Sequence, residues 1–246
     1  MKDWLPYEVL KNDNLIYDAV AVEIPIQLIL NNEKLTVSMC SPSQIREWAL
    51  GLLFTEGYLK SADDLVSIEV STDKNILKVF VETKLLQNRV NSMSLLSVTA
   101  CGICGKTSFD PISGQALSAN SKEFRPEELI EKLRSAQTVF NETGAVHAAG
   151  IYSEDSSLLI SAEDVGRHNA VDKCIGDLFQ RNLLSQARIL VVTSRVSYEI
   201  VAKAFKANLA VIVAVSAPTS LAIDFCKELG IQLYGFVRLG KVVRYT

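Results

Sequence analysis

The residues of this chain best suited to chemistry are two cysteines at C-x-x-C spacing, Cys101 and Cys104, in the string ACGICGK that ends at Lys106. Glycines on both sides leave the sulfur atoms little steric cover, and the neighbouring ammonium group favours the thiolate over the thiol. The thiolate is the form that attacks sulfur or binds a metal ion. The motif therefore makes reactive sulfur the leading hypothesis.

The remaining cysteines favour a reducing compartment. The chain has five cysteines, an odd number, and in such a compartment an isolated C-x-x-C is more often catalytic or metal-binding than structural. Cys174 and Cys226 fall on apolar helical faces and are expected in the core. The N-terminus lacks a signal pattern, and no apolar run reaches the ~18 residues of a membrane-spanning helix. We expect a cytoplasmic protein without a membrane partner.

The composition predicts a globular protein. At 246 residues and 48% hydrophobic content, the chain can bury one large core or two modest ones, with two domains favoured. Nothing in the net charge of −3 points to a nucleic acid or an anionic membrane as the main partner, so any phosphate site must be local.

The first part of the chain predicts a small α+β domain over residues 1–98. Apolar residues alternate over 17–39 with a break at Asn31-Asn32, which indicates paired strands. Ser41 is expected to cap a helix that ends at Gly57. Residues 64–70 and 76–82 predict a hairpin. Residues 99–125 then carry the C-x-x-C and a long connection.

Residues 126–246 predict an α/β domain. Helices are expected over 126–140, 164–182, 196–207 and 218–229, and strands over 143–152, 158–161, 189–192, 209–215 and 231–237. Strands that alternate with helices of about three turns indicate βαβ crossovers and a mainly parallel sheet.

Three strand ends of this domain lead into helices through polar turns that offer free backbone N–H groups. Their candidate ligand residues are Arg167 and His168, then Ser194 and Arg195, and then Ser216, Thr219 and Ser220. Ligands of open α/β sheets gather at the carboxyl ends of strands, and helix N-termini with a nearby arginine suit a phosphate. Ordinary helix capping explains any one turn equally well. Neither G-x-G-x-x-G nor a P-loop is present.

Two histidines and two late cations complete the candidates. His147 lies in an apolar stretch, where a structural role competes equally with a functional one, whereas His168 lies among charged groups that favour function. Arg238 and Lys241 flank a glycine turn, where they either bracket a phosphate or remain solvated.

Taken together, these strings resemble the FdhD family of formate dehydrogenase accessory sulfurtransferases over nearly the whole chain. The resemblance rests on AVE (21–23), LFTEG (53–57), ACGICGK (100–106), TGAVHAA (143–149), EDVGRHNA (163–170), SAPTS (216–220) and GFVR (235–238). The family implies a cytidine-deaminase-like three-layer α/β domain joined to a smaller N-terminal domain. Deaminases need H-x-E and a later P-C-x-x-C for zinc, and this chain has neither after His147.

The resemblance implies a sulfurtransferase that takes persulfide sulfur from a cysteine desulfurase. It would deliver this sulfur to the molybdenum bis(molybdopterin guanine dinucleotide) cofactor destined for formate dehydrogenase. Cys101 would carry the sulfur and Cys104 would assist. The cofactor, or GDP in its place, would contact the strand ends and the closing segment Phe236, Val237, Arg238, Leu239, Gly240 and Lys241. A homodimer is expected from the resemblance alone.

An alternative from another class is a structural zinc site in a binding protein. Cys101 and Cys104 could ligate zinc together with one or both histidines, as C-x-x-C spacing permits. His147 and His168 are farther apart than the H-x₃₋₅-H of compact zinc fingers. A thioredoxin-like reductase is a weaker third option because no βαβ unit opens at this C-x-x-C.

Overall fold

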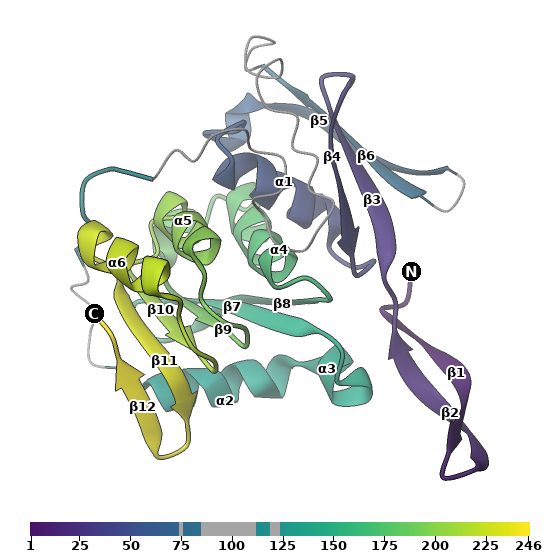
Figure 1. Ribbon diagram of the computed structural model, residues 1–246. Helices are drawn as coiled ribbons and strands as arrows, with labels where there is room; N and C mark the ends of the chain where they lie inside the picture. Colours follow the sequence, from purple (N-terminus) through teal and green to yellow (C-terminus); the bar gives the residue numbers. More distant parts are fainter. Residues whose placement is uncertain (74–75, 85–111, 119–123) are drawn as a thin grey trace.

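The computed structural model describes residues 1–73, 76–84, 112–118 and 124–246 (Figure 1). Cys101, Cys104 and most of the predicted 99–125 connection lie outside the described residues. The described residues form a mixed α/β protein with three sheets. The predicted α/β and α+β character is therefore confirmed, whereas the cytidine-deaminase-like label and the domain borders stay predictions.

The chain begins with a two-stranded hairpin that the sequence pattern did not predict in full. β1 (Trp4–Lys11) pairs antiparallel with β2 (Asn14–Ala21). Asn12 and Asp13 form the turn at φ 52° and 63°, a left-handed backbone that asparagine and aspartate tolerate. The hairpin projects from the N-terminal sheet, and its strand β2 contacts α3 (Figure 1).

A four-stranded sheet and one helix form the predicted N-terminal α+β unit. The strands β3 (Ile24–Leu30), β4 (Glu33–Cys40), β5 (Leu65–Asp73) and β6 (Ile76–Thr83) have the order β4-β3-β6-β5, in which only β3 and β6 are parallel. The helix α1 (Ile45–Thr55) packs on this sheet through buried Trp48 and Leu53. A short 3-10 turn, Ala62–Asp64, precedes β5.

The predicted cap of α1 is wrong. Gln44 is the N-cap residue, in a left-handed conformation, and no side chain caps the helix. The Ser41 hydroxyl instead accepts a hydrogen bond from the Val165 N–H at 3.1 Å, and the Ser41 N–H donates to the Asp164 carboxylate at 3.0 Å. Ser41 therefore forms its hydrogen bonds with Asp164 and Val165, far along the chain, and not with the first turn of α1.

The second half is a three-layer α/β arrangement. Its sheet has the order β12-β11-β10-β9-β7-β8. The strands are β7 (His147–Ser153), β8 (Leu158–Asp164), β9 (Ala187–Val192), β10 (Val211–Ala214), β11 (Gln232–Arg238) and β12 (Lys241–Arg244). The helices are α2 (Pro126–Ala136), α3 (Thr138–Thr143), α4 (Arg167–Gln180), α5 (Tyr198–Lys206) and α6 (Ser220–Leu229), with a 3-10 turn at Leu184–Gln186. α2 covers one face and α4, α5 and α6 cover the other (Figure 1).

The predicted βαβ crossovers are confirmed for β9, β10 and β11, which are parallel neighbours with a helix between successive strands. The other described pairs of this sheet are antiparallel, so the sheet as a whole is mixed and not mainly parallel. β7 and β8 are joined by a short turn, as are β11 and β12, and such connections allow only antiparallel pairing. The single helix expected over 126–140 is also divided, at Gln137, into α2 and α3.

α1 and α4 join the two halves through a very close helix contact. A Cβ atom at Gly51 would overlap the backbone oxygen of Asp172, and one at Gly176 would overlap the backbone oxygen of Glu47. Glycine at both positions lets the two backbones meet without intervening side chains. The N-terminal unit is thereby docked on the outer side of the α/β half.

Candidate functional site

Most of the predicted ligand residues meet at one edge of the six-stranded sheet. β8 and β9 both run antiparallel to β7, so the carboxyl ends of β8, β9, β10 and β11 lie at the edge where β7 begins. This edge carries Arg167 and His168 after β8, Ser194 and Arg195 after β9, and Ser216 after β10. Sheet topology therefore brings together turns that are far apart in the sequence.

Backbone hydrogen bonds hold three of these strand ends side by side. The Val196 N–H donates to the Ala217 carbonyl at 3.2 Å, and the Thr219 N–H donates to the Val196 carbonyl at 2.9 Å. The Phe236 N–H donates to the Ser216 carbonyl at 3.2 Å. The turns after β9 and β10 and the end of β11 therefore form one connected backbone surface.

Several predicted ligand side chains have structural roles here. The Thr219 hydroxyl accepts from the Ala222 N–H at 3.4 Å as the N-cap of α6, which begins at exposed Ser220. The hydroxyl of buried Ser194 donates to the Arg195 carbonyl at 3.0 Å. Val237 is fully buried against α2, so its side chain faces the core and not the sheet edge.

The closing segment forms a hairpin with one unusual backbone position. Arg238 pairs with Lys241 across the turn, in which Gly240 has φ 75° and Leu239 is exposed. Phe236 has φ 52° at an irregularity in the strand pairing. The Lys241 ammonium lies 5.4 Å from the centre of the Phe236 ring. This cation–π contact keeps both side chains near the strand ends.

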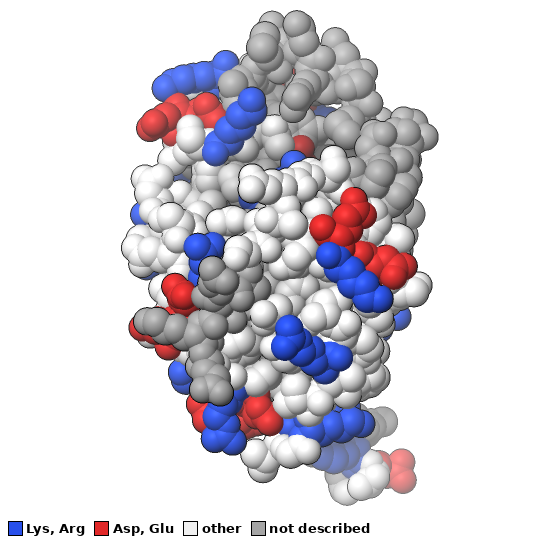
Figure 2. Space-filling model, turned by 90° about the vertical axis from the view of Figure 1, so that its left-hand side faces the viewer, with Lys and Arg blue, Asp and Glu red and all other residues white. Residues whose placement is uncertain are grey.

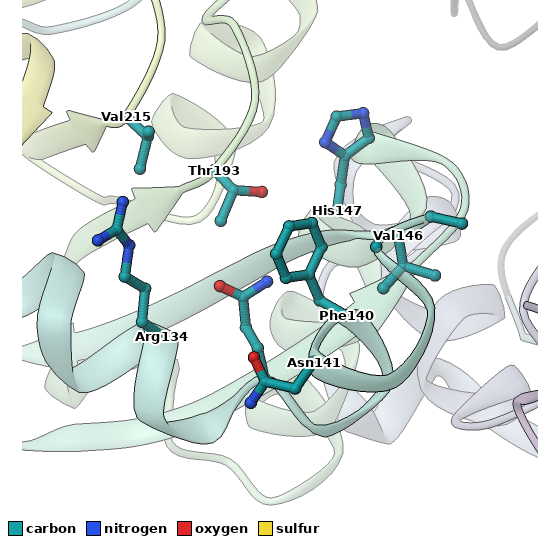
Figure 3. A pocket seen from close by; sticks show the side chains of 10 residues that line it. Arg134, Phe140, Asn141, Val146, His147, Thr193 and Val215 are labelled. Carbon is teal, nitrogen blue, oxygen red and sulfur yellow. The ribbon is translucent and has the colours of Figure 1, made fainter. Parts of the chain in front are cut away.

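A cavity of about 530 Å³ opens at this edge. Its lining comes from the start of β7, the ends of β9 and β10, the last turn of α2, and α3. The lining residues are Arg134, Gln137, Phe140, Asn141, Gly144, Ala145, Val146, His147, Thr193 and Val215. Figure 3 shows Arg134 and Val215 toward one end of the cavity and Phe140 and His147 toward the other.

Sequence reasoning missed most of this lining. Arg134, Gln137 and Phe140 belong to the segment that is expected as one helix over 126–140, in which the sequence indicates no site residue, and Asn141 follows that segment. The break between α2 and α3 turns these side chains toward the strand ends, and no local pattern signals that break. Thr193 belongs to the polar turn, with Ser194 and Arg195, that the sequence predicts as part of a phosphate site. Its backbone N–H donates to the Ala148 carbonyl at 3.1 Å, which attaches the turn to β7.

The imidazole of His147 lines the cavity. Burial lowers the pKa of His147 below its ordinary value of 6.5, and the positive charges of Arg167 and Arg195 lower it further, against an opposing effect of Asp164. Two arginines thus act electrostatically on one histidine at the sheet edge. This concentration of cations favours an anionic ligand.

The first turn of α4 adds to the positive character. Its N-cap is Gly166, which provides no side-chain cap, and the turn holds Arg167 and His168 but no acidic residue. The Arg167 Nε is buried and has no hydrogen-bond partner among the residues that the structure describes. His168 is buried, with its Nε2 atom 4.0 Å from a Glu199 carboxylate oxygen. The helix N-terminus therefore adds positive potential to a cationic edge.

Asp164 and Asn169 hold this turn to the N-terminal unit and take no part in the cavity lining. The buried Asp164 carboxylate lies 2.7 Å from the Lys173 ammonium and accepts from the Gly166 N–H at 2.7 Å. Asn169 donates to Asp164 at 2.9 Å and accepts from the Trp48 indole at 3.1 Å. The string 163–170 is thus partly a structural joint between the two halves.

The thiols within the described part of the chain are unsuited to sulfur chemistry. Cys40, Cys174 and Cys226 are free and buried, as predicted for the latter two. Burial raises the pKa of all three thiols, that of Cys226 to about 12. The described residues also hold no group of three histidine, cysteine or acidic side chains that could bind a metal ion.

The face of the molecule in Figure 2 is mostly uncharged, and its basic and acidic side chains lie next to one another in small mixed groups. Basic side chains, with acidic ones among them, lie toward its lower end. Among the described helices, none is long and apolar enough to cross a membrane.

Comparison with solved structures gives the class of fold. The chain is similar to a protein from Desulfotalea psychrophila described as a formate dehydrogenase accessory protein, with a TM-score of 0.71 and 22% identity. The match covers 99% of this chain and 96% of that chain.

Sequence comparison then gives the family. The model of the FdhD/NarQ family matches residues 21–246, and the chain belongs to this family. Proteins named "Sulfur carrier protein FdhD" are similar to it along most of their length. That of Sulfolobus acidocaldarius is 40% identical (93% of this chain, 89% of the relative), and that of Nocardia farcinica is 36% identical (90% and 84%).

Proposed function

We propose that this chain is a sulfur carrier for the maturation of formate dehydrogenase, with Cys101 as the carrying thiol and Cys104 as the assisting thiol. The observation that carries the proposal is the state of the other three cysteines. Each is buried with a raised pKa, which leaves the C-x-x-C as the candidate for thiolate chemistry. The names of the relatives support the same role.

The proposed reaction is persulfide exchange. The Cys101 thiolate attacks the terminal sulfur of a persulfide on a cysteine desulfurase, a new S–S bond forms, and the donor cysteine leaves as a thiolate. No net oxidation occurs, because one persulfide replaces another. Attack by Cys104 on the terminal sulfur would move it from Cys101 to Cys104 by the same chemistry. To release the sulfur as sulfide to the cofactor, the Cys104 thiolate would attack the inner sulfur of the Cys101 persulfide. Sulfide leaves, a Cys101–Cys104 disulfide forms, and a dithiol reductant then restores both free thiols.

The proposed sulfur acceptor is the molybdenum bis(molybdopterin guanine dinucleotide) cofactor, bound as a substrate at the sheet edge. The cavity next to Arg134, Arg167 and Arg195 suits one phosphorylated guanine nucleotide in size and charge. Phe140 offers an aromatic face, and Gln137 and Asn141 offer amides for a base. GDP is therefore a suitable probe of this site.

The partners and the compartment follow from the same proposal. The chain would act in the cytoplasm, receive sulfur from a cysteine desulfurase, and serve formate dehydrogenase before its cofactor is inserted. We also propose a homodimer. The net charge of −3 supports neither a nucleic acid nor an anionic membrane as a partner.

Intact mass spectrometry after incubation with a cysteine desulfurase and cysteine tests the carrier role. We expect a gain of about one sulfur atom that a reductant removes. The gain should be absent in Cys101→Ala. Cys104→Ala should load sulfur but release it more slowly, and Cys226→Ala, which removes a buried thiol, serves as the matched control.

An unchanged gain in Cys101→Ala would contradict the assignment. The zinc alternative is tested on the same samples by metal analysis. Stoichiometric zinc that is lost in both the Cys101→Ala and Cys104→Ala variants, with no sulfur gain in the wild type, would favour the structural metal site.

A further inference from the structure

The helix α3, which forms one wall of the cavity, is too short to be stable by itself. α3 has only six residues, and a helix this short gains little stability from its own hydrogen bonds. Its N-cap residue, Gln137, makes no side-chain cap. Phe140 and Asn141 nevertheless reach the cavity from this helix (Figure 3). Contacts from elsewhere in the fold must therefore place α3.

β2 packs against α3, and Glu163 of β8 supplies hydrogen bonds to its first turn. One carboxylate oxygen accepts from the Val139 N–H at 2.8 Å and from the Thr138 hydroxyl at 3.3 Å. The other oxygen accepts from the Phe140 N–H at 2.8 Å. A carboxylate at a helix N-terminus also complements the helix dipole. Glu163 therefore caps α3 from a neighbouring strand.

The strand end that carries Glu163 is itself fixed from the opposite face of the sheet. Successive side chains of a strand point to opposite faces, so Glu163 faces α3 while Asp164 faces α4. Lys173 of α4 donates to the Glu163 backbone oxygen at 3.2 Å and pairs with the Asp164 carboxylate. The fixed backbone at this point gives the Glu163 carboxylate a defined place from which to hold α3.

We propose that Glu163 is a positioning residue for the cavity. It holds α3 so that Phe140 and Asn141 form the wall against which a guanine nucleotide binds. Glu163 is not among the residues that line the cavity, so its influence passes through α3. The inference rests on the proposed function, because it assumes that the nucleotide part of the cofactor enters this cavity.

Two measurements on Glu163→Ala and Glu163→Gln test the proposal. Hydrogen exchange followed by mass spectrometry reports the protection of residues 138–143, and calorimetric titration with GDP reports affinity. We expect Glu163→Ala to exchange faster in α3 and to bind GDP about tenfold more weakly. Glu163→Gln keeps one acceptor oxygen and should be intermediate in both. Glu154→Ala, an exposed substitution in the connection between β7 and β8, should match the wild type.

Sulfur loading by a cysteine desulfurase separates this proposal from general damage to the fold, and all variants should load sulfur as the wild type does. Unchanged exchange of α3 in Glu163→Ala would overturn the positioning role. Faster exchange with unchanged GDP affinity would overturn its link to the cavity. If the wild type itself does not bind GDP, the proposed nucleotide site fails. If the wild type binds GDP and Glu163→Ala binds it equally well, only the positioning role of Glu163 is contradicted.

Discussion

At the scale of residues, adjacent side chains of one string have different tasks. Glu163 holds α3, Asp164 joins the sheet to the N-terminal unit, and Arg167 contributes positive charge near His147. The sequence pattern alone predicts ligand contact for the polar residues of 163–170. In the structure these residues have separate roles, because neighbouring strand residues face opposite sides of the sheet.

His147 gives a pH-dependent prediction. Its pKa is lowered in the folded protein by burial and by two arginines, whereas the unfolded chain has the ordinary value near 6.5. The unfolded state therefore binds a proton first as the pH falls, and the stability present above pH 6.5 decreases below it. His147→Gln removes this titration. We expect the difference in unfolding free energy between pH 7 and pH 5 to be smaller in the variant.

Urea denaturation at the two pH values measures this difference. His168→Gln is a useful comparison, because His168 is the other histidine of the chain and lies at the same sheet edge. An identical pH dependence in His147→Gln and the wild type would show that His147 does not titrate differently in the folded state.

At the scale of elements, the packing of α1 on α4 fixes the position of the site relative to the N-terminal unit. The contact combines the backbone approach at Gly51 and Gly176 with buried polar groups. Asp172 of α4 pairs with Lys203 of α5 at 2.7 Å and also receives a hydrogen bond from Thr55 of α1 at 3.2 Å. A buried carboxylate without partners is costly, so the partners of Asp172 on α1 and α5 must stay in place. The Asp172 carboxylate therefore links α1, α4 and α5.

Substitution of either glycine should separate the two helices. Gly51→Ala and Gly176→Ala each place a methyl group where backbone atoms of the other helix lie. We expect each variant to lose about 3 kcal/mol of unfolding free energy, as overpacked cores do. Chemical denaturation measures the loss, and Gln180→Ala, an exposed change at the end of α4, should leave stability nearly unchanged. Wild-type stability in both glycine variants would contradict the backbone contact.

At the scale of the whole molecule, the N-terminal hairpin is the most exposed apolar element among the described residues. On one face of the hairpin, Leu10, Leu15 and Tyr17 are 72%, 63% and 73% exposed. A two-stranded hairpin is only marginally stable alone in water, and an apolar patch of this kind marks an interaction site. We assign it to the proposed homodimer, in which a second copy would cover it.

Removal of this apolar surface should weaken the dimer. The double variant Leu10→Ser with Tyr17→Ser is expected to shift the protein from dimer toward monomer in light scattering during gel filtration. Leu158→Ser, which also removes a partly exposed apolar side chain but lies in β8, is the control. A dimer that persists at the same concentrations in the hairpin variant would exclude the hairpin as the contact.

The sequence by itself determined the local properties of this protein. Alternating and helical periodicities located most strands and helices, and apolar helical faces placed Cys174 and Cys226 in the core. The strings around Cys101, His147 and His168 pointed to the family that the comparisons show. These properties depend on residue type and short spacing, which a single sequence displays.

Only the tertiary structure decided which residues share a site. Arg134 and Phe140 reach the cavity because the chain breaks at Gln137, and Ser41 contacts Asp164 in place of its own helix. The sheet is mixed because short connections reverse β8 and β12, and because β7 lies between β8 and β9, an order that no short-range pattern indicates. Such contacts join residues separated by long stretches of chain, and their energy depends on how whole elements pack. No local pattern in the sequence records that packing.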